Sequence, residues 1–415
     1  MTLYGLASDI STMQFSRHCR VYTVRLPLLP IFLLFFILSS CASAAPTDDP
    51  TYGHWPLPSC PPRSDGSRME SALTKKGKDR AVRLARTLAP ESGGIKLLRQ
   101  LAIVGRAMAP AVKKSEGQTQ EANAADPYAA ALRALCWIVY DDPAHIDVPE
   151  PPKPPTKKGA VTPQLSSRHR RAIERYTLAA LYYSTSGPAT WVKKDGWLGA
   201  SDICSGSWMG VSCSGGYVSA ISLPFNNLDG RLPEEFWRLS RLSEIYLYGN
   251  SIKGPLPPAI KNLSKTLTVV QLHMNEFTGR IPKGFGSLVN LREASLYGNN
   301  FEGTLPAEIG NLKNLQILDI FATFVTGSLP STMEKMSSLK EVYLDETLLT
   351  GSIVRSQKGG ICDLKYLKVL KADCLDVSGW PAEVNCDCCT VCCNDMSNPR
   401  CLRMENGKAA KTNVD

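Results

Sequence analysis

Histidine and the common catalytic motifs are scarce in this sequence. Only 5 of its 415 residues are histidine, and it has no G-x-S-x-G elbow, phosphate-binding loop, H-E-x-x-H helix or protein kinase signature. Acyl transfer, phosphoryl transfer and zinc-dependent hydrolysis each depend on one of these arrangements. We therefore expect no catalytic residues, no metal and no cofactor, and a binding surface in their place.

Long apolar runs are also nearly absent. One run, residues 26–38, is shorter than the roughly 20 residues of a membrane-spanning helix. Arginines precede it and Ala42-Ser43-Ala44 follows it, which is the layout of a secretory signal with an A-x-A cleavage site. We predict a secreted or cell-surface protein with a signal peptide at residues 1–44. If this signal stays uncleaved, it anchors the chain as a type II membrane protein.

Acidic residues are scarce between Pro61 and Ser115. This stretch has 13 Lys and Arg against 4 Asp and Glu, an excess of nine that equals the formal net charge of +9 of the whole chain. Its sequence contains helix-like windows with one apolar side. A solvated helical face explains the charge, and attraction to acidic polysaccharide or lipid headgroups is the alternative. No nucleic acid partner is expected outside the cell.

Repetition is what the chain has in abundance. The phrase "LYGN" at residues 247–250 returns at 296–299, and "LHMNEFTGRIP" at 272–282 lies midway, so the steps are 25 and 24 residues. The same step finds further copies that begin at Leu223, Ile320 and Leu344. A unit of this length cannot bury its apolar side chains alone, so the pattern indicates stacked units.

Each copy has the same chemical order. Apolar residues at the first, fourth and sixth places, such as Leu242, Ile245 and Leu247, fit a short strand with one buried side. A glycine and then a proline follow, where the backbone turns and leaves the strand. Before the glycine, three places after the last apolar residue, stands an asparagine whose amide can bond the backbone of the turn. The predicted ladder is Asn226, Asn250, Asn275 and Asn299.

This order, LxxLxLxxNxLxGxIP, resembles the plant-type leucine-rich repeat over residues 218–373. Residues 180–213 are similar to the N-terminal cap of such proteins, and "CDCCTVCC" and "ALCWIVYDDP" resemble segments of secreted or membrane-anchored leucine-rich repeat proteins of algae. The resemblance implies an α/β solenoid, a leucine-rich repeat horseshoe or right-handed superhelix, with a helical N-terminal cap and a cysteine-rich C-terminal cap. It also implies a disulfide between Cys204 and Cys213, on either side of Trp208.

The other cysteines also favour an oxidising compartment. The chain has 14, and 12 remain if Cys19 and Cys41 leave with the signal, an even number. A metal cluster is the alternative for the dense group at residues 386–393, but structural zinc prefers two separated pairs. We therefore expect a disulfide cap, whose connectivity the sequence leaves open.

The composition of the remaining segments predicts where one part of the chain ends and the next begins. We predict disorder at residues 45–68, a basic helical segment at 69–147 and a stiff Pro-rich linker at 148–164. Ser166 and Ser167 mark the start of a helix that opens the N-terminal cap, residues 165–217. The repeats fill 218–373, and a cysteine-rich cap and tail fill 374–415. Thr323 and Thr347 replace the ladder asparagine and can bond the turn with less reach.

A binding face follows from strand alternation, because residues between the buried leucines point out of the concave sheet. Glu244, Glu293 and Glu341 border this face and favour a partner with positive or hydroxyl-rich groups. We expect Asp319, Asp345 and Asp373 on the same solvated face. The predicted ligand-binding residues are Tyr246, Tyr248, His273, Tyr297, Phe321 and Tyr343. Cross-strand packing without a ligand is the alternative.

These features predict an extracellular binding module without catalysis. Its concave face would recognise a protein, peptide or glycan, as the resemblance to receptor-like ectodomains implies. A structural cell-wall or coat protein, or a secreted inhibitor of a wall-degrading hydrolase, is the alternative. Asn262, in the acceptor sequence "NLS", is a predicted glycosylation site on the outer flank.

Overall fold

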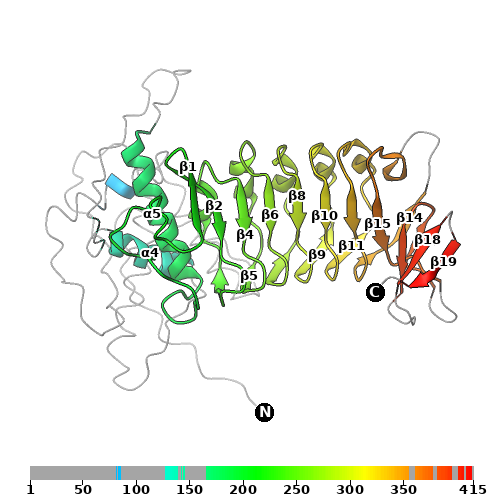
Figure 1. Ribbon diagram of the computed structural model, residues 1–415, viewed down its shortest axis with the longest axis horizontal. Coiled ribbons are helices and arrows are strands. Elements are labelled where there is room, and N and C mark those ends of the chain that lie inside the picture. Colours follow the sequence, from blue (N-terminus) through cyan, green and yellow to red (C-terminus); the bar gives the residue numbers. More distant parts are fainter. Residues whose placement is uncertain are drawn as a thin grey trace, which may run out of the picture. The chain divides into compact units, whose positions relative to one another are not determined.

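The repeats fold into two series of parallel strands that stack side by side (Figure 1). The computed structural model describes residues 81, 83–85, 127–138, 142, 144, 165–354, 360–376, 381–394, 401–405 and 408–413. The predicted signal, disordered stretch and linker lie outside the described residues, as does most of the basic segment. Those assignments and the domain boundaries stay predictions.

The first series, here called the long sheet, forms the sheet that was predicted to be concave. In the described chain its order is β1-β2-β4-β6-β8-β10-β12-β15-β17-β18-β19. The fourth-place apolar residue of each repeat pairs with its counterpart in the next, as Ile245 does with Val270 and Val270 with Ala294. This constant register lines up equal positions of successive repeats. The repeat strands are β4 (Glu244–Tyr246), β6 (Val269–Gln271), β8 (Glu293–Ser295), β10 (Ile317–Asp319), β12 (Glu341–Tyr343) and β15 (Val369–Ala372).

The second series forms on the other side of the ladder turns, in the order β13-β11-β9-β7-β5-β3. Five of these strands end at or next to the glycine of the repeat, which has a positive φ, for example 74° at Gly279 and 71° at Gly303. Side chains with a Cβ rarely adopt this conformation, which explains the glycine. The strands are β3 (Asp229–Arg231), β5 (Ser251–Gly254), β7 (Glu276–Gly279), β9 (Asn300–Thr304), β11 (Phe324–Gly327) and β13 (Leu348–Leu349).

Short 3-10 helices connect the two series on the outer side of the repeats. The proline of the repeat precedes five of them, where its missing N–H costs no hydrogen bond. Each helix turns an apolar side chain, such as Phe236 or Phe285, into the core that the repeat leucines share. The helices are η4 (Glu234–Arg238), η5 (Pro258–Leu263), η6 (Lys283–Ser287), η7 (Ala307–Asn311), η8 (Ser331–Lys335) and η9 (Ile361–Asp363).

A helix closes the N-terminal end of the solenoid. Helix α5 (Ser167–Ser184) begins after Ser166, whose side chain accepts a hydrogen bond from the backbone N–H of His169. Its buried Tyr176, Leu178 and Leu181 join the repeat core. The hairpin of β1 (Val211–Ser214) and β2 (Tyr217–Ser222) then leads into the first repeat. The helix and hairpin cover the apolar edge that a solenoid end would otherwise expose.

A buried ion pair joins the preceding helix to this cap. Arg175 has no exposed side-chain surface, and its Nη2 lies 2.7 Å from Oδ1 of Asp142, which is also fully buried. The guanidinium lies 5.1 Å from the ring of Trp137 and 5.0 Å from that of Trp208. Helix α4 (Pro127–Cys136) packs against α5 in the same core. Removing either partner of such a pair leaves a buried charge uncompensated.

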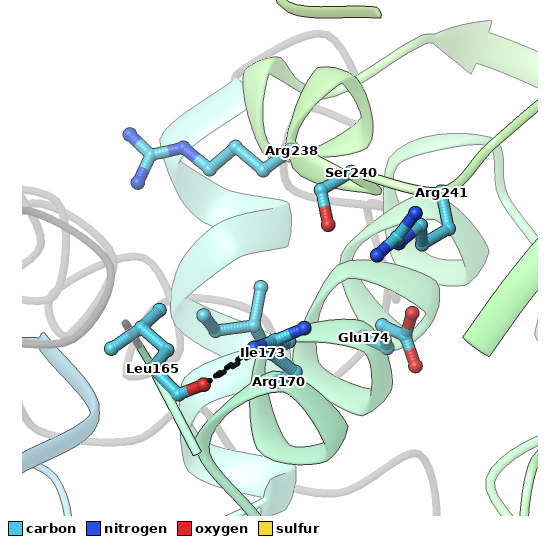
Figure 2. A pocket seen from close by; sticks show the side chains of 7 residues that line it. All are labelled: Leu165, Arg170, Ile173, Glu174, Arg238, Ser240 and Arg241. Atoms are coloured by element: carbon cyan, nitrogen blue, oxygen red, sulfur yellow. Dashed lines mark hydrogen bonds between the residues drawn. The ribbon is translucent and has the colours of Figure 1, made fainter. Parts of the chain in front are cut away.

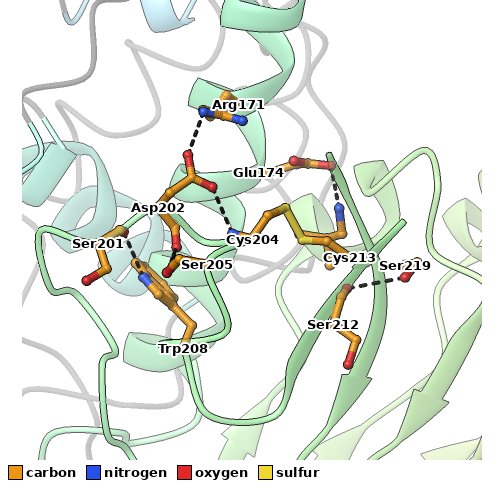
Figure 3. Close-up of a disulfide and its surroundings, with 11 residues drawn as sticks. Arg171, Glu174, Ser201, Asp202, Cys204, Ser205, Trp208, Ser212, Cys213 and Ser219 are labelled. Atoms are coloured by element: carbon orange, nitrogen blue, oxygen red, sulfur yellow. Dashed lines mark hydrogen bonds and ion pairs between the residues drawn. A yellow bond between two sulfur atoms is a disulfide. The ribbon is translucent and has the colours of Figure 1, made fainter. Parts of the chain in front are cut away.

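Cysteines cross-link both ends of the described chain. Cys204 and Cys213 form a disulfide with an S–S distance of 2.02 Å, and Figure 3 shows it beside Trp208, whose indole N–H donates to Ser201 O. At the C-terminal end, disulfides link Cys362 with Cys388, Cys374 with Cys392, Cys386 with Cys389, and Cys393 with Cys401. The same region holds β14 (Gly351–Ile353), β16 (Val384–Cys386), β17 (Val391–Cys393), β18 (Cys401–Glu405) and β19 (Lys408–Asn413).

The predicted fold class is confirmed, with the parallel solenoid, its helical N-terminal cap and its cysteine-rich C-terminal cap all present. No helix in the described part of the chain combines the length and the apolar character that crossing a membrane requires.

Candidate ligand-binding face

Four rings form a continuous row along the long sheet. Tyr248, His273, Tyr297 and Phe321 each follow the sixth-place apolar residue of consecutive repeats and are half-buried. Ring centroids are 4.5 Å apart between Tyr248 and His273, 4.4 Å between His273 and Tyr297, and 6.0 Å between Tyr297 and Phe321. We call this row the aromatic column.

Stacking decides which part of each ring faces outward. His273 is nearly parallel to Tyr248 and to Tyr297, with interplanar angles of 8° and 14°. Both faces of its ring are therefore covered by neighbours. At its centre the column offers ring edges and phenolic hydroxyls, rather than open ring faces, to a partner. Nδ1 of His273 lies 3.1 Å from the Ser295 hydroxyl, and burial lowers the pKa of this histidine.

Two residues outside the predicted binding set extend the row. Phe225 packs edge-on against Tyr248 at 5.3 Å, although it stands one place later in its repeat than the other rings. At the other end, Nζ of Lys371 lies 5.5 Å from the Phe321 ring centroid and 3.0 Å from Oδ2 of Asp345. The sequence could have indicated Lys371, because it occupies the outward fifth place of its repeat.

Carboxylates form a second row on the strands themselves. Tyr246 donates its hydroxyl to Glu244 at 3.1 Å, and Tyr343 does the same to Glu341 at 3.0 Å. Between them, Gln271 donates to Glu293 at 2.6 Å. Tyr246 and Tyr343 thus position acidic groups, and among the described residues no ring contact joins either tyrosine to the aromatic column. Burial and the Glu341 hydrogen bond raise the pKa of Tyr343 to about 12.

Asp319 lies next to the column on β10. Its Oδ1 accepts a hydrogen bond from the backbone N–H of Phe321 at 3.1 Å. Burial, opposed in part by that hydrogen bond, raises the pKa of Asp319 to about 6, and Asp345 adds to the rise. The charge of this site therefore changes in the mildly acidic range.

The expectation that all three aspartates lie on a solvated face is wrong for two of them. Asp345 is 2% exposed and Asp373 is 9% exposed. Asp345 pairs with Lys371, and Asp373 accepts a hydrogen bond from the backbone N–H of Thr347. Near the C-terminal cap, Asp345 thus stands at the place that a ring of the aromatic column holds in earlier repeats, and Asp373 bonds the turn as a ladder asparagine does. Both side chains are buried there.

The ladder asparagines bond across repeats. Asn275 donates to the carbonyl oxygen of Leu247 in the preceding repeat and to that of Leu272 in its own, and its Oδ1 accepts from Ile252 N at 3.0 Å. Asn250 and Asn299 make the corresponding bonds, and Asn226 bonds Lys193 of the cap instead. These asparagines hold the turn next to the aromatic column.

Asn262, the predicted glycosylation site, is exposed on η5, away from the long sheet. Its modification stays a prediction.

The described cysteines of the C-terminal cap are all disulfide-bonded. Their sulfur atoms are therefore not available as thiolate ligands for a metal ion.

Parallel repeat strands, the second sheet and the asparagine turns define a solenoid of plant-type leucine-rich repeats, and the predicted resemblance is confirmed. The Leucine Rich Repeat family model matches residues 241–263 and 290–312. Receptor-like protein 3 of Arabidopsis thaliana is 41% identical over 64 residues, which is 15% of this chain and 8% of that protein. Receptor-like protein kinase HSL1 of the same plant is 40% identical over 60 residues, 14% of this chain and 6% of that protein.

Among solved structures, the Arabidopsis receptor kinase HAESA in complex with the peptide hormone IDA and the co-receptor SERK1 has 29% identity to this chain. The match covers 42% of this chain and 29% of that one, with a TM-score of 0.38. The part of this chain that aligns with the two curated relatives spans less than a tenth of their length.

Proposed function

We propose that this chain is an extracellular binding module, without catalysis, whose long-sheet face recognises a peptide or protein segment that carries positive charge. The observation that carries this proposal is the row of half-buried rings beside a row of acidic side chains, both on one rigid sheet. Interfaces are enriched in such aromatic side chains, which combine apolar area with a polar tip.

Ring geometry favours a peptide over a neutral glycan. Sugars usually stack on open ring faces, but the faces of His273 are covered by Tyr248 and Tyr297. Edges, hydroxyls and carboxylates suit the N–H groups and side chains of an extended peptide instead.

The charges on this face form two borders. Glu244, Glu293 and Glu341 lie beside the column and are half-buried, which strengthens their attraction for a cation. Arg292 and Lys368, at the starts of the repeat strands, are exposed to water. A partner with a cationic side chain over the carboxylates fits this arrangement best, because the less solvated border dominates.

The covalent chemistry of the chain supports an extracellular compartment. Disulfides persist in oxidising environments, and the described C-terminal cap is densely cross-linked. The likeness of 64 residues of this chain to Receptor-like protein 3 also supports a cell-surface or secreted setting.

The test compares two glutamate variants of the full secreted chain. Partners cross-linked to the wild type in extracellular extract are identified, and the segment that binds is synthesised. We expect Glu293→Gln to weaken binding of that segment about tenfold or more, because charge-assisted hydrogen bonds are worth roughly 1.5–3 kcal/mol. Glu302→Gln, which neutralises an exposed glutamate on β9 of the second sheet, is the control and should bind as the wild type does. Equal binding by all three proteins would reject this face.

A structural role in a cell wall or coat is the second candidate, and the same stacking favours it, since parallel rings on adjacent strands also stabilise a sheet without any ligand. Localisation separates the candidates. A tagged chain recovered from medium or plasma membrane supports recognition, whereas retention in the insoluble wall residue supports the structural role. Inhibition of a wall-degrading hydrolase would require that the cross-linked partner be such an enzyme.

A further inference from the structure

A cavity of about 440 Å³ lies between helix α5 and the outer side of the first repeat. Figure 2 shows its lining, with Arg170, Ile173 and Glu174 on α5, Leu165 before it, and Arg238, Ser240 and Arg241 on and just after η4. Small-molecule pockets typically enclose about 300–1,000 Å³, so the volume suits a small ligand or one unit of a polymer. The aromatic column lies on a different face, so this cavity has no part in the function proposed above.

Two of the three arginines that line the cavity place their guanidinium groups near the ring of Tyr217. The guanidinium carbon of Arg170 lies 5.4 Å from the ring centroid of Tyr217, and that of Arg241 lies 5.8 Å from the same centroid. Arg170 is also fixed by hydrogen bonds to Leu165 O, at 3.0 and 2.8 Å, and to the Tyr217 hydroxyl at 3.3 Å. Two like charges are therefore held at one ring, an arrangement that an anion between them would relieve.

Few described carboxylates offset the arginines of this cavity, although the carboxyl of Glu235 interacts with Arg238 on the same 3-10 helix. Neither Arg238 nor Arg241 forms an ion pair with any carboxylate in the described part of the chain. Both side chains are exposed at the mouth of the cavity. Glu174 is the acidic residue in the lining, and it is buried and accepts a hydrogen bond from Val218 N at 3.1 Å. Its carboxylate is thus engaged in holding β2 to the helix.

We propose that this cavity binds an acidic sugar unit, a hydroxylated ring that carries a carboxylate or a sulfate. Arginine forks recognise both groups through paired N–H···O bonds. The lining is not uniformly charged, because Leu165 and Ile173 provide apolar surface and Ser240 provides a hydroxyl. A bare inorganic ion would leave that surface unused, whereas the carbon face and hydroxyls of a sugar ring match it.

Glu174 gives the site a pH dependence. The groups that act on this carboxyl are Arg170 and Arg171 on its own helix, Asp202 in the cap loop and the Val218 N–H on β2. Arg238 and Arg241 line the same cavity from the repeat side. Figure 3 shows Asp202 paired with Arg171, so that charge is largely offset. Burial raises the pKa of Glu174 to about 7. Below that pH the carboxyl is neutral and no longer opposes an anion, so binding should tighten as the pH falls.

The test is calorimetric titration of the full chain at pH 5.5 with named probes. These are a diglucuronate, glucose 6-sulfate, inorganic sulfate, neutral cellobiose and tetraglutamate. We expect the two acidic sugars to bind at least about tenfold more tightly than sulfate and cellobiose. Tetraglutamate should bind no better than sulfate. Any background from the basic segment is the same for every variant of the chain.

Variants locate the site. Arg241→Ala should weaken the acidic sugars about tenfold, and Arg241→Lys should weaken them less, because it keeps the charge and loses the fork. Arg280→Ala removes an exposed arginine from the repeats elsewhere and should change nothing. Wild-type binding should fall about two- to fivefold between pH 5.5 and 8, the scale of a partly exposed charge interaction. Glu174→Gln, which keeps an acceptor for Val218 N, should remove that pH dependence.

Three results would overturn the proposal. Unchanged affinity in Arg241→Ala would place any binding outside the cavity. Equal affinity for sulfate and the acidic sugars would show that the ring is not recognised. Tighter binding of tetraglutamate than of the acidic sugars would assign the cavity to an acidic peptide.

Discussion

Repeats in the middle of the solenoid and repeats near its C-terminal end are held together differently. In the middle, Asn275 and Asn299 bond backbone groups of both their own and the preceding repeat, and Phe277 and Phe301 stack in the core at 6.0 Å. Near the end, Thr323 and Thr347 donate only to carbonyl oxygens of their own repeats, at 2.7 and 2.6 Å. The shorter side chain cannot reach the neighbour.

Disulfides stabilise the C-terminal end of the solenoid, beyond the last ladder asparagine. Cys362–Cys388 and Cys374–Cys392 join the last repeat to the terminal strands, across 26 and 18 residues of sequence. Interior repeats can rely on hydrogen bonds because they have a neighbouring repeat on both sides. A terminal repeat has only one neighbour and so lacks the stabilisation that a second neighbour would give. Disulfides offset this loss because they restrict the conformations of the unfolded chain.

The largest effect is expected from breaking the C-terminal constraint. Replacing both Cys374 and Cys392 by serine should lower the free energy of unfolding by about 3 kcal/mol, the value for a loop of this length. Urea unfolding followed by hydrogen exchange measures it. Protection should be lost first in β15 and β17 while β4 to β8 stay protected. Uniform loss along the whole solenoid would contradict a regional role.

The ladder itself is tested by a matched pair. Asn275→Ala leaves buried backbone groups of two repeats unpaired and should cost roughly 1–3 kcal/mol of unfolding free energy. Thr323→Ala loses one bond within its own repeat and should cost about 1 kcal/mol or less. Thermal and urea unfolding of the two variants compare them directly. An equal or larger loss in Thr323→Ala would show that the two ends do not differ as described.

The pH dependence of stability should report the raised pKa of Asp319 at the centre of the long sheet. The pKa of Asp319 is raised in the folded state to about 6, above its unfolded value of 3.8, so the folded protein binds the extra proton between these values. The stability that Asp319 contributes therefore falls as the pH rises from about 4 to about 6, by an amount on the order of 1 kcal/mol after allowance for partial exposure. Asp319→Asn should show a smaller fall over that range. A larger fall in the variant would reverse the assigned sign.

The smallest effect on stability is expected at the outer flank. Asn262 is exposed on η5, so a glycan there would cover neither sheet. Glycosidase treatment should lower the mass of the wild type, and Asn262→Gln should abolish that shift while changing stability by no more than about 0.5 kcal/mol. An unchanged mass after treatment would show that the site is unmodified.

Sequence periodicity was sufficient to predict the repeats, the ladder and the row of outward rings. A constant step of 24 or 25 residues fixes the register, so equal places such as Tyr248 and Tyr297 must line up. Beyond the last regular repeat, periodicity gives no information about which residues are buried or bonded. The burial of Asp345 depends on Lys371 and the cap, and the disulfide pairs depend on how the terminal strands pack.

The arginine cavity could not be predicted for a similar reason. Arg170 and Arg241 are 71 residues apart in the numbering and meet only because α5 folds back onto the first repeat at Tyr217. No local pattern marks either residue.

The most direct test of the central claim, that the aromatic column recognises a partner, measures binding and stability on the same protein. Tyr297→Ala should weaken binding of the identified partner by about 2 kcal/mol, as expected for an interface hot spot. Its unfolding free energy should fall by less than about 1 kcal/mol, the scale of a cross-strand pair. Tyr366→Ala, at an exposed tyrosine outside the column, is the control and should keep full binding. Full partner binding by Tyr297→Ala with lowered stability would contradict recognition and leave the column as sheet packing.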